Sequence, residues 1–541
     1  MRGDVLNLIL GWTLIAFTVP LVICGIITCI LDDVAIGLRA FGPAALISLS
    51  LGGAMVFFFT RTDSGERLRD VEAFVGVGLV WPISVLIGAL PFWLGGVFVG
   101  PFTSGAELSD ILTGFIHSWF ESMSGFTTTG ATVIHASSSP MCDSTTLDCI
   151  NSQHRGLLLW RSLTQWFGGM GIIMLGMMIL SRVLGGGMAL ARAELTGPSL
   201  SRLKPKLRQT ATALWGLYVT LTVLEFLLLF FVGQMGWFDA VNHALTTLPT
   251  GGFSTHDASI GFYDSVTVEA IVTVFMFLAG VNFTLLWLSR KGSISLLWKD
   301  EEFRYYSFYI LIAFVLISLT LINTGHGYGE SLRDGIFQVV SIATSTGYAS
   351  ADYMPWPVVT HVAFFILMII GASAGSTGGG LKLLRVSLAF KIAMSELRRI
   401  AQPRKVDRIR MNNEVVEDRQ IGLIVGMLFV WVILFGGASI LLAIMMPDAS
   451  FESIVSLVAS SLGNTGPALG EYGPSNTWVG MENSGLILTS ILMWFGRLEL
   501  LTAVIVLHPH TWRREDKSDG EVQGVAVVKR MLQDKEELNS K

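Results

Sequence analysis

Long apolar segments recur along the whole chain and constrain its fold more than any other feature. A transmembrane helix needs about 20 consecutive, mostly apolar residues. Only 14% of the 541 residues are charged, whereas about 25% is usual in soluble domains. The sequence therefore predicts a membrane protein, with ten candidate spans at 8–31, 41–60, 73–99, 156–181, 211–235, 267–289, 305–323, 358–395 (interrupted), 420–446 and 484–507.

Lysine and arginine residues gather in alternate connecting segments. With the N-terminus placed in the cytoplasm, the inside segments hold most of these residues and the outside segments hold very few. The outside ones are Arg39, Arg155, Arg161 and Arg333. This asymmetry follows the positive-inside rule, which counts basic residues in short loops. It supports the ten spans and predicts that both termini are cytoplasmic.

Four segments between the spans, all on the predicted outside, share one pattern. Each has about a dozen semi-apolar residues, enough for a short helix, followed by small or hydroxylated residues around one glycine. The segments are HSWFESMSGFTTTGATV (117–133), DAVNHALTTLPTGGFST (239–255), DGIFQVVSIATSTGYAS (334–350) and ESIVSLVASSLGNTGPALG (452–470). Internal repeats of this kind decide the architecture of a chain before any single motif does.

The four glycine loops are predicted to form an ion-selectivity filter. Non-helical backbone at membrane depth is tolerated only where it is buried in protein or lines a water-filled path. A ring of carbonyl oxygens can replace the hydration shell of K⁺, and the partially negative C-terminal ends of the short helices favour a cation. The predicted K⁺-binding filter residues are Thr128, Thr129, Gly130, Thr250, Gly251, Gly252, Ser345, Thr346, Gly347, Asn464, Thr465 and Gly466.

A glycine-rich stretch interrupts the eighth span. It reads GASAGSTGGGLK (371–382), and each glycine costs a helix up to about 1 kcal/mol relative to alanine. The stretch is either a kinked span with close helix packing or a loop that crosses the pore beneath the filter. Arg497 lies inside the last span, where an arginine costs roughly 2.5–3.5 kcal/mol. It either extends to the cytoplasmic surface or points into the cavity below the filter.

Other polar residues on the predicted outside leave alternatives open. Cys142 and Cys149 lie in MCDSTTLDC and either form a disulfide, which an oxidising compartment permits, or remain free thiols. Carboxylates on the short helices either cap those helices or lie in their first turns, or they form an outer rim that attracts cations, to which His256 and Asp257 just past the second filter loop would also belong. The carboxylates are those of Glu121, Asp239, Asp334 and Glu452.

Enzymatic and nucleic-acid functions find little support. The phosphate-binding pattern GxxxxGK[ST] and the metalloprotease pattern HExxH are both absent from the sequence. GSTGGGLK imitates a phosphate loop, but it lies inside an apolar span with no strand before it. The net charge of −5 argues against a nucleic-acid partner. We therefore expect no enzyme activity and no cofactor on this chain.

Six motifs in a fixed order identify a known family. They are SGFTTTGAT (124–132), QWFGGMGII (165–173), RAELTGP (192–198), GGFSTHDASIGFYDS (251–265), GASAGSTGGGLK (371–382) and FGRLEL (495–500). Together they resemble the membrane subunit of bacterial Trk potassium uptake systems, within the Trk/Ktr/HKT superfamily. The resemblance extends from residue 1 to about residue 514.

The resemblance implies an all-α integral membrane protein of ten transmembrane helices. Two N-terminal helices would precede four helix–pore-loop–helix repeats, arranged with pseudo-fourfold symmetry around one pore. The implied divisions are an N-terminal hairpin (1–72), pore repeat 1 (73–182), repeat 2 (211–290), repeat 3 with a broken second helix (305–400), repeat 4 (420–508) and a cytoplasmic tail (509–541).

The family also implies a gate where the glycine stretch meets the last span. The implied gate residues are Gly371, Ala374, Gly375, Ser376, Thr377, Gly378, Gly379, Gly380 and Arg497. Glycine at all four filter positions resembles the potassium-selective members of the superfamily.

By the resemblance, the expected activity is uptake of K⁺, and also Rb⁺, across the cell inner membrane. The pore would be channel-like, gated and driven by the electrochemical gradient, with a cation symporter that couples K⁺ to H⁺ or Na⁺ as the alternative. The expected partners are a second copy of the chain in a homodimer, membrane lipid, and a cytoplasmic nucleotide-binding regulatory subunit that binds NAD or ATP/ADP.

Overall fold

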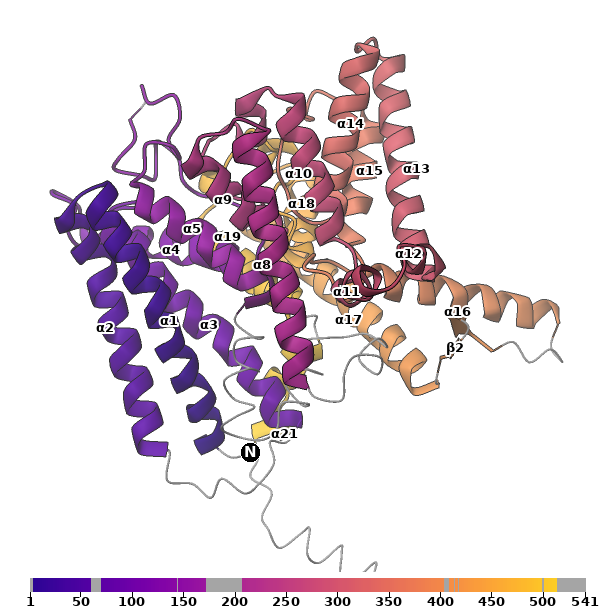
Figure 1. Cartoon of the computed structure of the whole chain (residues 1–541), viewed down its shortest axis with the longest axis horizontal. Coiled ribbons are helices and arrows are strands. Elements are labelled where there is room, and N and C mark those ends of the chain that lie inside the picture. Colours follow the sequence, from indigo (N-terminus) through magenta and orange to yellow (C-terminus); the bar gives the residue numbers. More distant parts are fainter. Residues whose placement is uncertain are drawn as a thin grey trace, which may run out of the picture.

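The computed structural model describes residues 3–59, 70–143, 145–171, 207–402, 408–412, 414–416, 418–498 and 501–512. The RAELTGP motif, most of the predicted inside basic segments before residue 207 and the C-terminal tail lie outside the described residues. Within the described ranges the chain is mostly helical (Figure 1).

Six helices of the described part are long and apolar enough to cross a membrane. Helices suit this role because all backbone polar groups must be paired within the segment in lipid. The six correspond to six of the predicted spans. They are α1 (Gly3–Leu31), α2 (Val34–Phe59), α3 (Asp70–Gly95), α8 (Leu207–Phe231), α13 (Glu301–Asn323) and α17 (Asp418–Met445).

The sixth predicted span, 267–289, is wrong as one continuous helix. It consists of α10 (Val266–Ala279) and α11 (Phe283–Lys291), which meet at a bend of 102°. Asn282 starts the second helix, because its side-chain oxygen accepts hydrogen bonds from the backbone N–H groups of Thr284 and Leu285 at 2.9 and 3.2 Å. An asparagine in this position is a strong helix N-cap.

Three further predicted spans each contain two helical elements. The span at 358–395 consists of α15 (Val358–Ile369) and α16 (Leu383–Ala401), with a non-helical segment between them as expected. The span at 156–181 starts with α5 (Arg155–Trp166) and the π-helical η1 (Phe167–Gly171), and the last span contains α19 (Asn483–Arg497) and α20 (Leu501–Leu507). The total of ten spans stays a prediction.

Four shorter helices precede the four predicted filter loops. They are α4 (Leu108–Phe126), α9 (Trp237–Thr247), α14 (Tyr328–Ala343) and α18 (Phe451–Gly463). The C-terminal half of each helix is buried, whereas its N-terminal turn retains exposed residues. These helices therefore end inside the protein, which brings the loops that follow them into the interior.

The remaining elements are small and lie in the connections. One antiparallel hairpin, which the all-α prediction did not include, pairs β1 (Arg410–Met411) with β2 (Glu414–Val415), so that Arg410 faces Val415. The short helices are η3 (Ser259–Tyr263), α12 (Ser295–Lys299), η4 (Gly470–Tyr472), η5 (Trp478–Gly480) and α21 (Pro509–Trp512).

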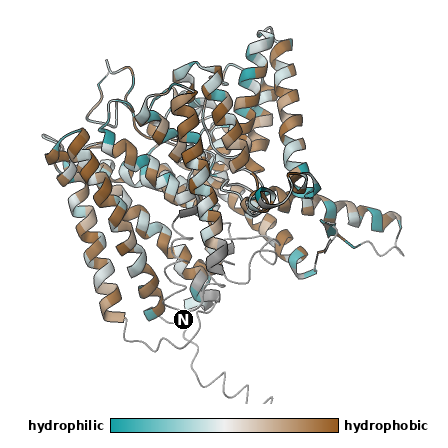
Figure 2. Cartoon of the chain, in the orientation of Figure 1, coloured by the Kyte–Doolittle hydropathy of each residue, from teal (hydrophilic) through white to brown (hydrophobic). Residues whose placement is uncertain are grey.

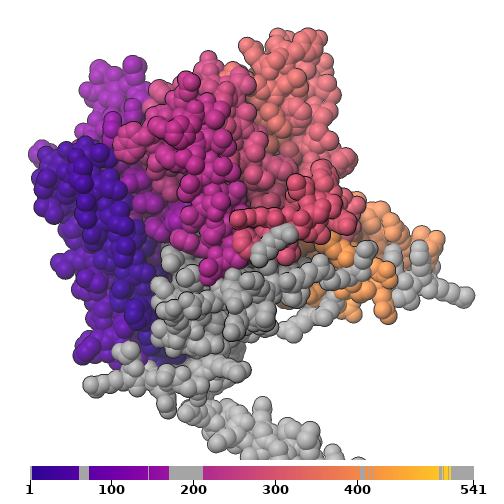
Figure 3. Space-filling view, viewed as in Figure 1, coloured from indigo at the N-terminus to yellow at the C-terminus, as the bar shows by residue number. Residues whose placement is uncertain are grey.

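Helices α1 and α2 form a closely packed pair on one flank of the molecule, opposite α13, α14 and α15 (Figures 1 and 3). A Cβ atom on Gly52 would lie 2.8 Å from the carbonyl oxygen of Gly11, so only glycine permits this approach. Small residues serve the same purpose wherever membrane helices pack closely. The outward faces of the pair are apolar (Figure 2), with Ile30 and Phe57 each 74% exposed, as expected for contact with lipid.

Candidate functional site

All four short helices end in the same backbone turn. After α4, the N–H of Thr128 bonds to the carbonyl of Gly125 at 3.0 Å, and the N–H of Thr129 bonds to that of Ser124 at 2.9 Å. The other loops repeat both hydrogen bonds. The pairs are Thr250 with Thr247 and Gly251 with Thr246, Ser345 with Ile342 and Thr346 with Ser341, and Asn464 with Ser461 and Thr465 with Ser460.

Two residues of every loop adopt left-handed backbone, which is uncommon outside glycine. The first lies two positions before the filter glycine and the second is the glycine itself. The φ angles are 54° at Thr128 and 87° at Gly130, 58° at Thr250 and 78° at Gly252, 58° at Ser345 and 81° at Gly347, and 50° at Asn464 and 101° at Gly466. Strained backbone of this kind concentrates at functional sites.

The four filter glycines contact one another's loops in cyclic order. A Cβ atom added to each glycine would collide with a carbonyl oxygen of the next loop along the chain, and the fourth loop returns to the first. The contacts run from Gly130 to Gly251, from Gly252 to Thr346, from Gly347 to Thr465 and from Gly466 to Thr129. The sequence-predicted filter residues are therefore brought together, although the first and last of the four glycines, Gly130 and Gly466, are 336 residues apart in the sequence.

Uncharged oxygen atoms dominate this cluster. The side chains of Thr129, Thr346 and Thr465 are fully buried, and the hydroxyl oxygens of Thr128 and Thr465 have no hydrogen-bond partner among the described residues. No group of three or more His, Cys, Asp or Glu side chains in the described part is arranged to hold a metal ion. The donor set thus consists of carbonyl and hydroxyl oxygens, which suit a hard monovalent cation.

The glycine-rich segment between α15 and α16 is a loop rather than a kinked helix, and it packs against three of the filter loops. Thr377 donates its hydroxyl hydrogen to the carbonyl of Leu248 at 2.8 Å. The N–H of Gly379 bonds to the hydroxyl of Ser345 at 2.6 Å, and a Cβ atom on Gly379 would collide with the carbonyl of Gly463.

The same loop is attached to the break between α10 and α11. The N–H of Ser373 bonds to the carbonyl of Gly280 at 3.1 Å, and the N–H of Phe283 bonds to that of Gly375 at 3.0 Å. Each break therefore satisfies backbone groups that the other leaves free, which explains how two interrupted helices are tolerated in one apolar interior.

Arg497, the last residue of α19, connects the glycine-rich loop to η1. Its guanidinium donates to the carbonyl of Thr377 at 2.8 Å and to those of Gly168 and Gly169 at 2.6 and 2.9 Å. Of the two expectations for this arginine, the contact with the 371–380 loop is the one observed. Carbonyl oxygens also satisfy a guanidinium that the apolar span would otherwise destabilise.

The acidic residues near the short helices differ from one another. Asp239 and Glu452 lie in the first turns of α9 and α18, as predicted for helix-capping charges. Asp334 lies well inside α14, so the expected first-turn position is wrong for it. Glu121 is fully buried within α4 and paired with Arg161 at 2.6 Å, so it belongs to no exposed rim. Glu121 lies in a short helix between predicted spans and its partner lies in the fourth predicted span, which is why the sequence pattern did not reveal the pair.

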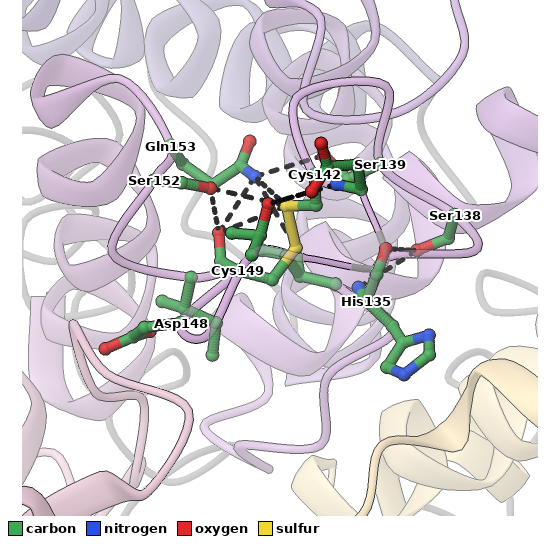
Figure 4. Close-up of a disulfide and its surroundings, with 12 residues drawn as sticks. His135, Ser138, Ser139, Cys142, Asp148, Cys149, Ser152 and Gln153 are labelled. Atoms are coloured by element: carbon green, nitrogen blue, oxygen red, sulfur yellow. Dashed lines mark hydrogen bonds between the residues drawn. A yellow bond between two sulfur atoms is a disulfide. The ribbon is translucent and has the colours of Figure 1, made fainter.

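Cys142 and Cys149 form a disulfide within the loop that connects α4 to α5 (Figure 4). The side-chain amide of Gln153 donates to the carbonyl of Cys149 at 3.0 Å and to the hydroxyl of Ser139 at 3.0 Å. These bonds connect Cys149, one end of the disulfide-closed turn, and Ser139, just before the turn, to the residues that precede α5.

The disulfide loop interlocks with the residues that follow the second filter loop. The carboxylate of Asp257 accepts hydrogen bonds from the N–H groups of Cys149 and Ile150 at 2.8 and 2.9 Å. In the opposite direction, Asp148 accepts from the Asp257 N–H at 3.1 Å and contacts His256 at 2.7 Å. Burial opposes protonation of His256, but hydrogen bonds and charges of Asp148 and Asp239 raise its pKa to about 9.

A multi-helix membrane protein with neutral oxygen donors gathered in its interior belongs to the class of ion transport proteins. The profile of the TrkH family, described as a cation transport protein, matches residues 102–512. The chain therefore belongs to the TrkH family.

Individual relatives match over nearly the whole length. The chain is 35% identical to the Trk system potassium uptake protein TrkH of Escherichia coli K12, over 95% of this chain and all of the relative. It is 33% identical to the protein of the same name from Halomonas elongata, over 94% and 98% of the two chains. The crystal structure of the potassium transporter TrkH from Vibrio parahaemolyticus superimposes with a TM-score of 0.79 at 30% identity, over 95% of this chain and all of that one.

Proposed function

We propose that this chain takes up K⁺, and also Rb⁺, across the cytoplasmic membrane through a selective, gated pore. The cyclic contact of the four glycine loops is the observation that carries this proposal. The names of the relatives, which are potassium uptake proteins and a potassium transporter, support K⁺ as the transported ion. Inward movement of one K⁺ releases about 2.3 kcal/mol per 100 mV of membrane potential, so the electrochemical gradient suffices as the driving force.

In this proposal the twelve filter residues bind K⁺ with backbone carbonyl and threonine or serine hydroxyl oxygens. The recurrent left-handed residues and the identical turns support a pseudo-fourfold arrangement of the four repeats around one pore. The buried C-terminal ends of α4, α9, α14 and α18 add partial negative charge near the ion. No cofactor other than the transported ion is required for this function.

The gate in this proposal consists of residues 371–380 and Arg497. The contacts of Thr377 with Leu248 and Arg497 and of Gly379 with Ser345 support a loop that closes the path next to the filter. The positive charge of Arg497 would repel a cation that leaves the filter. Movement of this loop would have to exchange its hydrogen bonds, which makes it a two-state element that a partner can bias.

The wider assembly is also a proposal. We infer ten transmembrane helices with both termini in the cytoplasm, a homodimer in the inner membrane, and a cytoplasmic nucleotide-binding regulatory subunit that acts on the gate. The relatives' name, a Trk system protein, supports a membrane subunit of a larger system. The apolar side chains that α2 and α17 expose support contact with lipid or with a second copy of the chain.

Cation flux into liposomes that contain only this purified chain tests the function. We expect K⁺ and Rb⁺ to enter faster than Na⁺ and Li⁺ under an imposed membrane potential, without any gradient of another ion. A flux of K⁺ that appears only with a pH or Na⁺ gradient would instead establish the symport alternative. Equal flux of all four cations through the folded protein would contradict the selective filter.

A further inference from the structure

One position on the short helices ties each helix to the chain segment that follows its own filter loop. This position lies nine residues before the filter glycine, and it is occupied by Glu121, His243 and Gln338 in the first three repeats. All three side chains are essentially or fully buried. Each reaches forward past its glycine. Glu121 accepts from the backbone N–H of Val133 at 3.1 Å, His243 bonds to the hydroxyl of Ser254 at 3.0 Å, and Gln338 donates to the carbonyl of Ala351 at 3.2 Å.

The fourth repeat has an apolar residue, Leu457, at this position. In this repeat the corresponding hydrogen bond is formed by the preceding residue, Ser456, whose hydroxyl accepts from the backbone N–H of Leu469 at 2.9 Å. In all four repeats, therefore, a side chain of the short helix forms a hydrogen bond to the outgoing segment, which is the segment that follows the filter loop. Each loop is thus held at both of its ends by the same helix. The chemical nature of the tie nevertheless differs from repeat to repeat.

Only in the first repeat is the residue at this position an acidic one, Glu121, and Arg161 of α5 forms an ion pair with it. The Arg161 Nε lies 2.6 Å from a Glu121 oxygen, and the two side chains are 3% and 0% exposed. The other side of the guanidinium donates to the carbonyl of Ser254 at 2.8 Å and stacks 3.5 Å from the ring of Phe253. Arg161 therefore joins the outgoing segment of the first filter loop to that of the second.

Two other pairs of neighbouring loops are joined by contacts between neutral groups. Thr246, at the end of α9, bonds to the hydroxyl of Tyr348 at 2.5 Å and so joins the second and third loops. Asn464 donates to the hydroxyl of Thr129 at 3.1 Å and joins the fourth and first. A buried ion pair differs from these contacts because its loss leaves an uncompensated charge in a low-dielectric interior.

We propose that the Glu121–Arg161 pair is a positioning element for ion selectivity, which sets the spacing of the first and second filter loops. The inference rests on the proposed function, because it assumes that these loops select the ion. Neither residue contacts the ion path in this proposal. Both act through the backbone that follows Gly130 and Gly252. This follows from their hydrogen bonds, because Glu121 accepts one from the backbone N–H of Val133 and Arg161 donates one to the backbone carbonyl of Ser254.

The test compares K⁺ and Na⁺ flux into liposomes for Arg161→Met and for the double variant Glu121→Gln/Arg161→Met. The double variant removes both charges and avoids leaving one of them buried alone. We expect both variants to lower the K⁺/Na⁺ flux ratio by roughly tenfold, a coupling within the range seen for contacting groups. Arg333→Met is the matched control, because it breaks a different ion-pair group, in which Arg333 of α14 contacts Glu269 at 2.8 Å and Asp264 at 2.9 Å, and none of these three is one of the twelve filter residues.

The outcomes separate this inference from the proposed function. If the unmutated chain is selective and the folded double variant keeps the same ratio, the positioning role is overturned. A ratio that falls equally in Arg333→Met would also overturn it, because any loosening of the fold would then suffice. If the double variant does not fold, Arg161→Lys decides. It keeps the charge beside Glu121 but loses the forked contact with Ser254, and an unchanged ratio would contradict the inference. Absence of selectivity in the unmutated chain would contradict the proposed function itself.

Discussion

The filter glycines combine a positive φ angle with a neighbour that leaves no room for a side chain. At Gly130 the φ angle is 87°, and an added Cβ atom would collide with the carbonyl oxygen of Gly251. Substitution therefore has two effects, because it strains the backbone and displaces a carbonyl of the adjacent loop. The same pair of effects applies at Gly252, Gly347 and Gly466.

We predict that Gly130→Ser lowers K⁺/Na⁺ discrimination by about tenfold, since a change of about 1.4 kcal/mol in relative binding suffices for that ratio. The measurement is competitive cation flux in liposomes. Gly436→Ser is the control, because nothing lies within 4 Å of the position that its Cβ would occupy. Unchanged selectivity in folded Gly130→Ser would count against the alignment of the four loops.

Arg497 gives a second prediction at the residue scale. Its guanidinium holds the carbonyls of Thr377, Gly168 and Gly169 together, and two unit charges 4 Å apart interact by about 4 kcal/mol at an effective dielectric constant of 20. In the proposed gate, removing this charge lowers a barrier and frees the glycine-rich loop. We therefore expect Arg497→Ala to raise K⁺ flux by about tenfold or more.

Single-channel or liposome flux recordings check this expectation, with Arg497→Lys as the charge-conserving comparison. The lysine keeps the positive charge and should retain most of the barrier. If Arg497→Ala conducts like the unmutated chain, the arginine serves packing alone and the proposed gate loses its main charge.

At the scale of elements, the loop that connects α4 to α5 behaves as a clamp on the second filter loop. The disulfide closes this loop, and Asp148 and Asp257 exchange hydrogen bonds across the two segments. His256, only 4% exposed, adds its ring to the clamp by contacting Asp148 and stacking on Phe262 at 3.6 Å. The clamp thus continues the chain of contacts that starts at the filter.

We predict that this clamp weakens at alkaline pH. The pKa of His256 is raised from 6.5 to about 9, so its protonated form contributes stability that is fully present below pH 6.5. That contribution is lost as the pH rises through about 9, because the neutral ring no longer attracts Asp148 and Asp239. The thermal unfolding midpoint should fall by several degrees between these pH values.

The measurement is thermal unfolding of the purified chain from pH 6.5 to 9.5, with His256→Gln as the comparison. The glutamine variant should start at a lower midpoint and show a flatter pH dependence. An identical decline in both proteins would assign the pH effect to other groups.

At the scale of the whole molecule, the interior contains the polar groups of the candidate site, whereas much of the outer surface is apolar. The four loops, the two broken helices and the Glu121–Arg161 pair lie inside, where most buried polar groups need a hydrogen-bond partner. The long helices α1, α2 and α17 contribute none of the four loops, and their apolar faces are largely exposed. These faces are available for lipid and for the proposed second copy.

We predict that the detergent-solubilised chain forms a dimer with twice the 58.9 kDa mass of one copy. Native mass spectrometry or light scattering with detergent correction measures this mass. A monomer that still transports K⁺ selectively in liposomes would contradict the dimer and leave the pore within a single chain intact.

The sequence by itself determined the class of protein, most spans and the four related loops. Lipid forces each span to satisfy its own backbone, so long apolar runs and charge asymmetry can be read without knowing what packs against them. The presence of four similar glycine loops was also predictable, because glycine and hydroxyl residues recur at one place in each repeat, whereas their role as a filter stays a proposal. Even the division between α15 and α16 was expected from its glycines.

Only the tertiary structure decided which groups meet. The bend between α10 and α11 was missed because apolar residues flank Gly280 and Asn282 on both sides, and the backbone groups freed there bond to the distant 371–380 loop. Glu121 pairs with an arginine 40 residues away, and Asn464 bonds to Thr129 across 335 residues. Such contacts depend on how separate helices pack, and no local pattern of residues encodes that packing.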